Sequence, residues 1–226
     1  MRRARIVGLT LLAMAAGSVA LAAQGGGGGP RWTFAAGATG VRVQSLAPTG
    51  VISELSGTTL GGSGGVALGR LALDIGYWQG RVAPEGAAGG AGVRPPARDY
   101  TEGTVLLGVQ PVGWLRVRGG VQARTYVTPA GTERWVFWQV RVRAEQMILE
   151  PAVRVHGELW RAISTEVNAP QPLDRGQGGE VGLTVRLPRW PLSARLTYGI
   201  DDAKLGGGVR RETVDQLSLT IGFGVR

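Results

Sequence analysis

The sequence predicts an all-β protein that folds as an antiparallel, up-and-down transmembrane β-barrel of about ten strands. Apolar/polar alternation, connections of two different lengths and the lack of a helical pattern after the N-terminal segment predict this fold. Alternation is clearest in the last segment, where the apolar face comprises Leu217, Leu219, Ile221, Phe223 and Val225. Because strand side chains point alternately to opposite sides, this face meets an apolar environment. A closed barrel can carry such faces through a membrane.

The first residues predict export. Met1–Arg5 carries three arginines, an apolar stretch runs from Ile6 to about Leu21, and Ala20-Leu21-Ala22 supplies the small residues of a signal-peptidase site. An uncleaved anchor is the alternative, because the stretch is nearly long enough to span a bilayer. We predict a signal peptide at 1–22, a glycine-rich linker at 23–31 and an outer-membrane barrel at 32–226.

Charge and composition exclude several classes of function. The formal charge of +9 falls to +6 when Arg2, Arg3 and Arg5 leave with the signal peptide, and the remaining arginines are spread singly along the strands. A nucleic-acid partner is therefore not predicted, because it would need a basic patch. The chain has no cysteine and one histidine, so we predict no disulfide, no metal site and no cofactor.

Ten segments show the alternation of a strand. Each is about as long as a tilted bilayer crossing requires. The predicted strands are Trp32–Ser45, Val51–Leu60, Val66–Gln79, Thr101–Gln110, Trp114–Tyr126, Trp135–Met147, Pro151–Ala162, Gly179–Leu187, Leu192–Ile200 and Thr213–Val225.

The connections alternate in length, as in barrels with short periplasmic turns and long outer loops. Short turns are predicted at Pro111–Gly113, Ile148–Glu150 and Pro188–Pro191, and long loops at Gly80–Tyr100, Val127–Arg134, Ile163–Gly178 and Asp201–Glu212. Counting back from the C-terminus predicts a further periplasmic turn at Gly61–Gly65. An even strand number requires Val51–Leu60 to be a strand; eight strands is the alternative if the first pair lies outside the barrel.

Aromatic residues gather near the predicted strand ends and predict interfacial girdles. They are Tyr77, Trp78, Trp114, Tyr126, Trp135, Trp160 and Trp190. Alternation places Trp114, Tyr126, Trp135 and Trp160 on the polar face, so the predicted girdle is partial. A soluble exported sandwich or lipocalin-like barrel is the rival architecture, with its apolar face turned inward. The heavily charged polar faces favour the membrane barrel, because charge suits a lumen.

The polar face predicts a lumen charge network. Its members are Arg70, Asp74, Glu102, Arg116, Arg118, Arg124, Arg141, Arg143, Glu145, Arg154, His156, Glu158, Glu180, Arg186 and Arg195, and Arg42 lies on the same predicted face. A barrel of this size is filled by its own side chains, which favours packed ion pairs. The excess of arginine leaves an anion-selective passage or an anion-binding pocket as the other interpretation.

Catalytic candidates are few. His156 and Glu158 lie two residues apart on one strand face and could act as a general-base pair, with Ser164 beyond the predicted strand end. Asp201-Asp202 is the only aspartate pair. A surface hydrolase of lipid or peptide that uses His156, and a soluble periplasmic ligand binder, are the alternatives to a non-enzymatic barrel.

Over Trp32–Arg226 the alternation pattern resembles that of the small outer-membrane β-barrels of Gram-negative-type bacteria. The resemblance implies location in the outer membrane, contact with its lipid, a monomer and insertion by the barrel assembly machinery. Members act as porin-like pores, anchors, adhesins, proteases or lipid-modifying enzymes, so it does not fix function. The class usually ends in an aromatic residue, whereas this chain ends Phe223-Gly224-Val225-Arg226. The Ser164, His156 and Glu158 set loosely resembles that of outer-membrane lipid A deacylases, and the ten-strand count resembles omptin-type proteases.

Overall fold

The computed structural model describes residues 29–46, 52–84, 96–129, 131–150, 152–168, 172–187, 189–206 and 210–225. The predicted signal peptide and most of the predicted linker lie outside these residues. The described part of the chain contains no helix that could cross a membrane.

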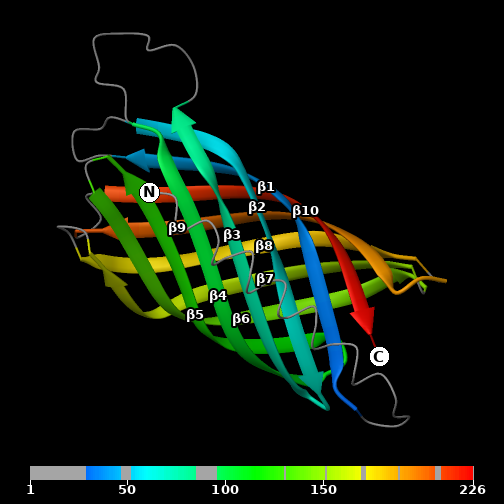
Figure 1. Ribbon diagram of the computed structural model, residues 1–226. Helices are drawn as coiled ribbons and strands as arrows, with labels where there is room; N and C mark the ends of the chain where they lie inside the picture. Colours follow the sequence, from blue (N-terminus) through cyan, green and yellow to red (C-terminus); the bar gives the residue numbers. More distant parts are fainter. Residues whose placement is uncertain are drawn as a thin grey trace.

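Ten antiparallel strands form a closed barrel, which confirms the predicted fold class and strand number (Figure 1). The strands are β1 (Arg31–Leu46), β2 (Ile52–Leu68), β3 (Leu71–Pro84), β4 (Arg98–Val112), β5 (Leu115–Thr128), β6 (Gly131–Leu149), β7 (Val153–Val167), β8 (Leu173–Arg186), β9 (Leu192–Leu205) and β10 (Arg210–Val225). Each strand pairs with its sequence neighbours, and β1 closes the barrel on β10, from Trp32 opposite Val225 to Leu46 opposite Arg211.

The predicted turn at Gly61–Gly65 is wrong, because β2 runs through these glycines. Gly61 lies opposite Gly37 of β1 and Trp78 of β3, within unbroken registers. A Cβ atom on Gly61 would lie 2.1 Å from the carbonyl oxygen of Tyr77 and 2.8 Å from the Trp78 ring. Glycine is therefore required for close approach of the neighbouring strand rather than for a turn.

The chain reverses instead at Gly69–Arg70, between β2 and β3. Gly69 has a φ of 58°, in the left-handed region that glycine adopts without steric cost. The third strand accordingly begins at Leu71 rather than at the predicted Val66.

Most of the predicted long loops are also strand. β5 ends at Thr128 and β6 begins at Gly131, while β9 continues to Leu205. We call the end of the barrel that holds Gly69–Arg70 and the end of β10 the turn end, at the lower right of Figure 1, and the opposite end the loop end. The strands extend toward the loop end beyond the length that a bilayer crossing needs.

The polarity of the wall reverses along the strands, and this reversal explains their length. On β9, Leu196 and Tyr198 are exposed on the outer face, whereas Ala203 and Leu205 nearer the loop end are buried inside. On β10, Leu219 is exposed outside and Val214 is buried inside. Toward the turn end the barrel is therefore apolar outside and polar inside, and at the loop end it has the apolar interior of a water-soluble barrel.

An outer apolar belt surrounds the barrel. We define it by the exposed residues Leu60, Leu71, Ile75, Val105, Leu107, Trp138, Val140, Val142, Leu159, Val181, Leu183, Leu196, Tyr198, Leu217, Leu219 and Ile221. On β9 the apolar face runs from Leu192 to Ile200, about 27 Å at about 3.4 Å per residue. A tilt of about 40° reduces this to about 21 Å, close to the ~25 Å apolar band of outer-membrane barrels.

Candidate functional site: the lumen

An apolar plug fills the loop end of the lumen. It consists of Val41, Val43, Leu55, Val82, Tyr100, Tyr126, Trp135, Phe137, Ala203, Leu205 and Val214, with Ala162, Val167 and Leu173 packed against it. All ten strands therefore contribute a side chain. The Tyr100 and Tyr126 rings meet edge to face with centroids 5.5 Å apart. The members of the cluster are 0–6% exposed, so their side chains pack closely across this end of the lumen.

Three of the aromatics that the sequence places on the polar face lie inside the barrel, so the girdle is partial. Tyr126 and Trp135 are fully buried inside the barrel, and Trp160 is nearly so. Of the predicted girdle residues, Tyr77, Trp114 and Trp190 are exposed, as a girdle requires. The sequence carries a signal for this difference, because Trp135 and Phe137 have odd numbers whereas the outward residues of β6 have even numbers.

Arg124 organises the layer beneath the plug. Its Nε and Nη2 donate to Glu102 Oε2 at 3.1 and 2.9 Å, and Nη2 also pairs with Asp201. Asp201 in turn accepts from Trp160 Nε1 at 2.8 Å, and Glu102 accepts from the Tyr100 hydroxyl. Arg124 is 2% exposed, so its hydrogen bonds are made away from bulk water.

Glu158 is the centre of a second layer. It pairs with Arg118, with Arg141 Nη1 at 3.1 Å, and more distantly with Arg143 Nη1 at 3.8 Å. Arg118 also reaches Asp74 at 3.2 Å. One carboxylate thus meets three guanidinium groups, which is the packed network that a narrow barrel accommodates.

The layer nearest the turn end is less completely paired. His156 Nε2 lies 2.8 Å from Glu180 Oε1, and Arg154 Nη1 donates to Glu145 Oε1 at 2.9 Å. Within the part of the chain that the structure describes, the Arg195 guanidinium makes one hydrogen bond, from Nε to Thr184 Oγ1 at 3.3 Å. Arg116 has Asp74 at 4.0 Å and no hydrogen bond among the described residues. The polar lumen is therefore densely bonded at its centre and sparsely bonded near the turn end.

Three arginines of the predicted polar face lie elsewhere. Arg70 occupies the β2–β3 turn, and Arg186 is the exposed last residue of β8. Arg42 points outward between the buried Val41 and Val43 and pairs with Glu54 on the outer face. It lies in the part of β1 where polarity has already reversed.

The sequence interpretation also missed several interior groups. Asp201 and Glu212 lay in a predicted loop, yet both are inside the barrel; Glu212 accepts from the Tyr126 hydroxyl at 2.8 Å. Gln122 and Gln139, by contrast, lie on the polar faces that the sequence predicts for their strands; they are buried and hydrogen-bonded to each other at 3.2 Å. Because Asp201 and Glu212 lie inside the barrel and Arg42 lies outside, the excess of arginine in the lumen is smaller than predicted.

The catalytic candidates are not assembled into a site. His156 pairs with Glu180 rather than Glu158, whose carboxylate is occupied by arginines. Ser164 is exposed eight residues further along β7, about 26 Å at about 3.3 Å per residue. Asp201 points inward to Arg124 and Asp202 outward to Arg211, so they cannot act as a pair. The described residues contain no cluster of potential metal ligands.

No family model and no curated protein matches the chain. Similar solved structures include the translocator domain of the autotransporter NalP from Neisseria meningitidis, at 13% identity over 97% of this chain and 95% of that chain, with a TM-score of 0.46. A second is Ail, the attachment invasion locus protein of Yersinia pestis, at 11% identity over 86% of this chain and 97% of that chain, with a TM-score of 0.39. A third is Neisserial surface protein A, at 10% identity over 86% of this chain and 98% of that chain, with a TM-score of 0.35. The chain's own closed antiparallel barrel is what confirms the predicted resemblance to small outer-membrane β-barrels, at the level of fold.

Proposed function

We propose that this protein is a non-enzymatic outer-membrane β-barrel of structural or binding type whose lumen is closed at the loop end. The observation that carries the proposal is the outer apolar belt around a barrel whose lumen is polar toward the turn end. Contiguous apolar surface of this extent is rare on soluble proteins and is the surface that lipid stabilises. The belt also supports lipid as partner and argues against a soluble periplasmic binder.

Closure of the lumen supports a barrel that does not conduct freely. The apolar plug draws on every strand, and beneath it Arg124 bridges Glu102 and Asp201. An anion that entered from the turn end would have to displace both layers to pass through. We therefore propose that anion permeability, which the arginine content suggests, is slight.

The non-enzymatic part of the proposal is supported by the separation of the catalytic candidates. His156 is 1% exposed at its side chain and sits within the lumen network, where a lipid or peptide on the cell surface would meet the plug first. A general base must come within hydrogen-bond reach of the proton that it removes. The arrangement instead favours His156 as a structural partner of Glu180.

Insertion by the barrel assembly machinery is proposed on the last strand. Phe223 is exposed on the outer face of β10 and lies opposite Phe34 at the seam where the barrel closes. It is the aromatic nearest the C-terminus and can take the role that a terminal aromatic has in this class. Phe223→Ala should lower the amount of folded protein in the outer membrane, and an unchanged amount would remove Phe223 from this role.

Two measurements test the function. Membrane-extracted protein should migrate differently in SDS gels before and after boiling, because a closed barrel has no free sheet edge at which to unfold. Recovery from the soluble periplasm without such a shift would contradict the membrane location. In planar bilayers the folded protein should give no stable open channel; large steady conductance would contradict the closed lumen.

A further inference from the structure

We propose that the turn-end part of the lumen is a binding site for a phosphate-bearing anion, formed by Arg116, Arg143 and Arg195 and open only toward the turn end. The site itself follows from geometry within the barrel. Its assignment to the periplasmic side rests on the proposed function.

The first observation is a deficit of acceptors around Arg143. This residue is 8% exposed, and its Nη2 is buried with no hydrogen-bond partner among the described residues. Its nearest carboxylate oxygens, on Glu158, Glu180 and Glu145, are 3.8–3.9 Å away, beyond hydrogen-bond distance. Leaving buried N–H groups of a cation unsatisfied is costly, so this position calls for a further acceptor.

The second observation is that two further guanidinium groups on the lumen face make few hydrogen bonds, although both are more exposed than Arg143. Arg116 lies opposite Arg143 in the β5–β6 register and makes no hydrogen bond in the described part of the chain. Arg195 lies on the lumen face of β9, opposite Thr184 of β8 in the register, and its side chain is exposed. The single hydrogen bond among the three groups in these residues is the one from Arg195 to Thr184.

The neighbouring carboxylates face other donors and stop short of hydrogen-bond distance from Arg143. Glu145 accepts from Arg154, Glu158 from Arg118 and Arg141, and Glu180 is held by His156 at 2.8 Å. Arg124, by contrast, makes three hydrogen bonds to two carboxylates nearer the loop end. A planar guanidinium is complementary to two oxygens of one anion, so a single oxyanion could satisfy several of these donors at once.

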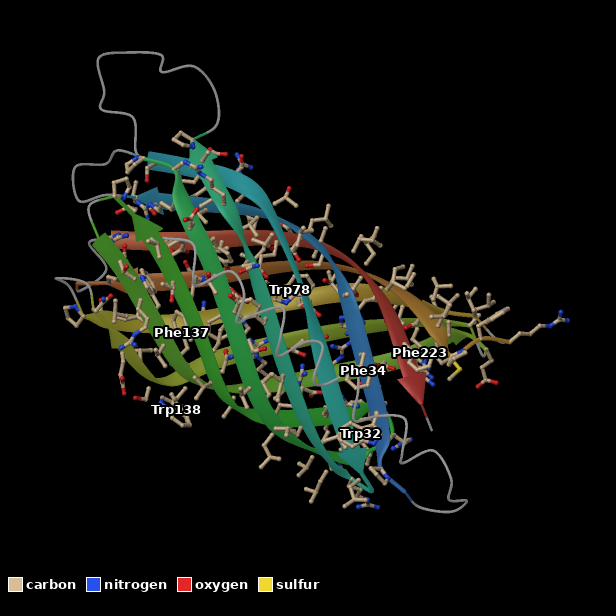
Figure 2. All side chains as sticks on the ribbon, in the orientation of Figure 1. Trp32, Phe34, Trp78, Phe137, Trp138 and Phe223 are labelled. Atoms are coloured by element: carbon tan, nitrogen blue, oxygen red, sulfur yellow. The ribbon has the colours of Figure 1, made fainter. Side chains whose placement is uncertain are left out.

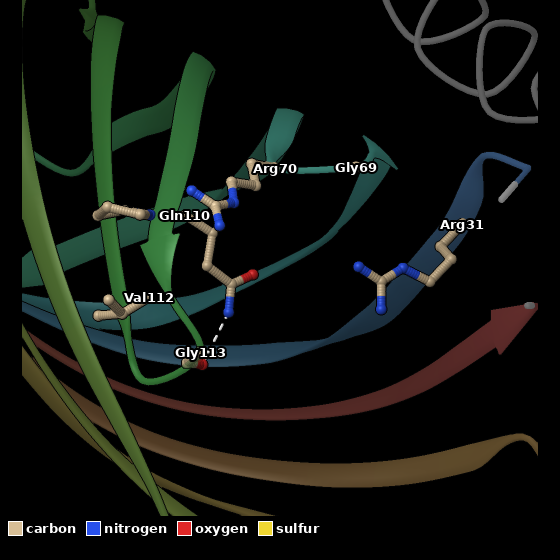
Figure 3. Close-up of a pocket in the computed structure, with 7 residues that line it drawn as sticks. Arg31, Gly69, Arg70, Gln110, Val112 and Gly113 are labelled. Atoms are coloured by element: carbon tan, nitrogen blue, oxygen red, sulfur yellow. Dashed lines mark hydrogen bonds between the residues drawn. The ribbon is translucent and has the colours of Figure 1, made fainter.

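The third observation is a basic approach from the turn end. A pocket of about 280 Å³ opens there beside Arg31, Arg70 and Gln110, and Figure 3 shows both arginines at its edge. Neither guanidinium has a hydrogen-bond or ion-pair partner in the described residues. The pocket also includes Gly113, three residues before Arg116. With the plug closing the other end, an anion would enter and leave on the same side.

A phosphate group fits this site best among common anions. Its oxygens accept from several guanidinium forks, and arginine recognises phosphate in paired hydrogen bonds. The group could belong to inorganic phosphate or to a lipid head group, because both present the same oxyanion. We expect one bound anion per barrel, given the narrow lumen.

Binding is tested with folded protein in a neutral detergent, by titration calorimetry with inorganic phosphate and, separately, with a short-chain phosphatidylglycerol. Arg143→Gln and Arg195→Gln should each weaken binding by at least about tenfold, because each removes charged donors. Arg81→Gln is the matched control, since Arg81 is exposed on the loop-end outer surface and should leave affinity unchanged. Arg195→Gln keeps the test valid if Arg143→Gln does not fold.

The outcomes distinguish free phosphate from a lipid head group as the bound anion. They also distinguish failure of the anion site from failure of the proposed function. Binding of inorganic phosphate alone assigns the site to free phosphate, and binding of the lipid alone assigns it to head groups; either supports the site. No saturable binding of either probe, or equal affinity in all variants, overturns it. Each sample is first checked for the heat-dependent gel shift, so a folded barrel that binds nothing contradicts this inference and leaves the proposed function standing.

Discussion

Phe137 and Trp138 are neighbours on β6 and lie on opposite sides of the barrel wall. Phe137 is 1% exposed within the apolar plug, whereas Trp138 is 48% exposed on the outer apolar belt. Figure 2 labels both side chains. Apolar side chains thus occupy both faces at this level of β6. The pair marks the height at which the barrel changes from an apolar exterior to an apolar interior.

Truncating the two aromatics should have different consequences. Phe137→Ala leaves a cavity among Trp135, Trp160 and their neighbours and should lower the free energy of unfolding by about 3–5 kcal/mol. Trp138→Ala removes no plug contact and should cost much less in lipid vesicles. Urea titrations of both variants, followed by the gel shift, measure the difference. Equal losses would mean that the plug is not a packed core.

The adjacent residues Asp201 and Asp202 each pair with an arginine, one inside the barrel and one outside, which allows a second comparison of stability. Arg124→Met leaves Asp201 and Glu102 buried without their counter-charge and should destabilise by about 3–5 kcal/mol. Arg211→Met breaks the exposed pair with Asp202 and should cost less than about 1 kcal/mol. Equilibrium urea unfolding is the measurement. Similar small effects in both variants would indicate that water fills the layer beneath the plug.

The outer apolar belt predicts a position-dependent cost of charge. Leu219→Arg places a cation in the belt on β10 and should cost about 2–4 kcal/mol in lipid vesicles. Thr213→Arg introduces the same residue nearer the loop end of the same strand, where charge already lies outside, and should be nearly neutral. The folded fraction after refolding into vesicles measures this. If the two variants fold equally well, the belt does not face lipid.

Cysteine labelling tests the orientation, and the chain offers a cysteine-free background. Lys204→Cys, near the loop end of β9, should react with a membrane-impermeant maleimide on intact cells. Leu196→Cys, in the belt, should not react, and Arg189→Cys, in the β8–β9 turn, should react only after the outer membrane is permeabilised. Labelling of Arg189→Cys but not Lys204→Cys on intact cells would invert the orientation.

Adjacent glycines on β5 test the close approach of strands. A Cβ atom on Gly120 would lie 2.1 Å from the Val105 carbonyl oxygen, whereas the nearest atom to one on Gly119 would be 3.8 Å away. Gly120→Ala must displace the β4 backbone and should destabilise by about 1–3 kcal/mol, while Gly119→Ala should be tolerated. Thermal unfolding in detergent compares the two. Equal stability would show that β4 and β5 separate without cost.

The sequence predicted the barrel and its ten strands because the turn-end part of most strands has a simple period of two. It failed at Gly61–Gly65, where glycine was interpreted as a turn although Trp78 requires it for packing. It also assigned Asp201 to a loop and Arg42 to the lumen, because apolar residues change parity within one strand. The candidate site was predicted as a set of residues on one face, but the partners, such as Glu180 for His156, could not be predicted. Which carboxylate meets which arginine depends on strands far apart in the chain.

The sequence by itself determined the fold class and the face on which most turn-end residues lie, because alternation along a strand is a local property. Tertiary structure decided the rest. Closure of β1 on β10 brings every strand around one narrow space. Only then do the apolar loop-end residues meet as a plug, and only then is it decided which arginines have a carboxylate partner. Arg143 and Arg124 are alike in sequence pattern. The acceptors that surround each of them, and therefore what each can bind, depend on residues from strands across the barrel.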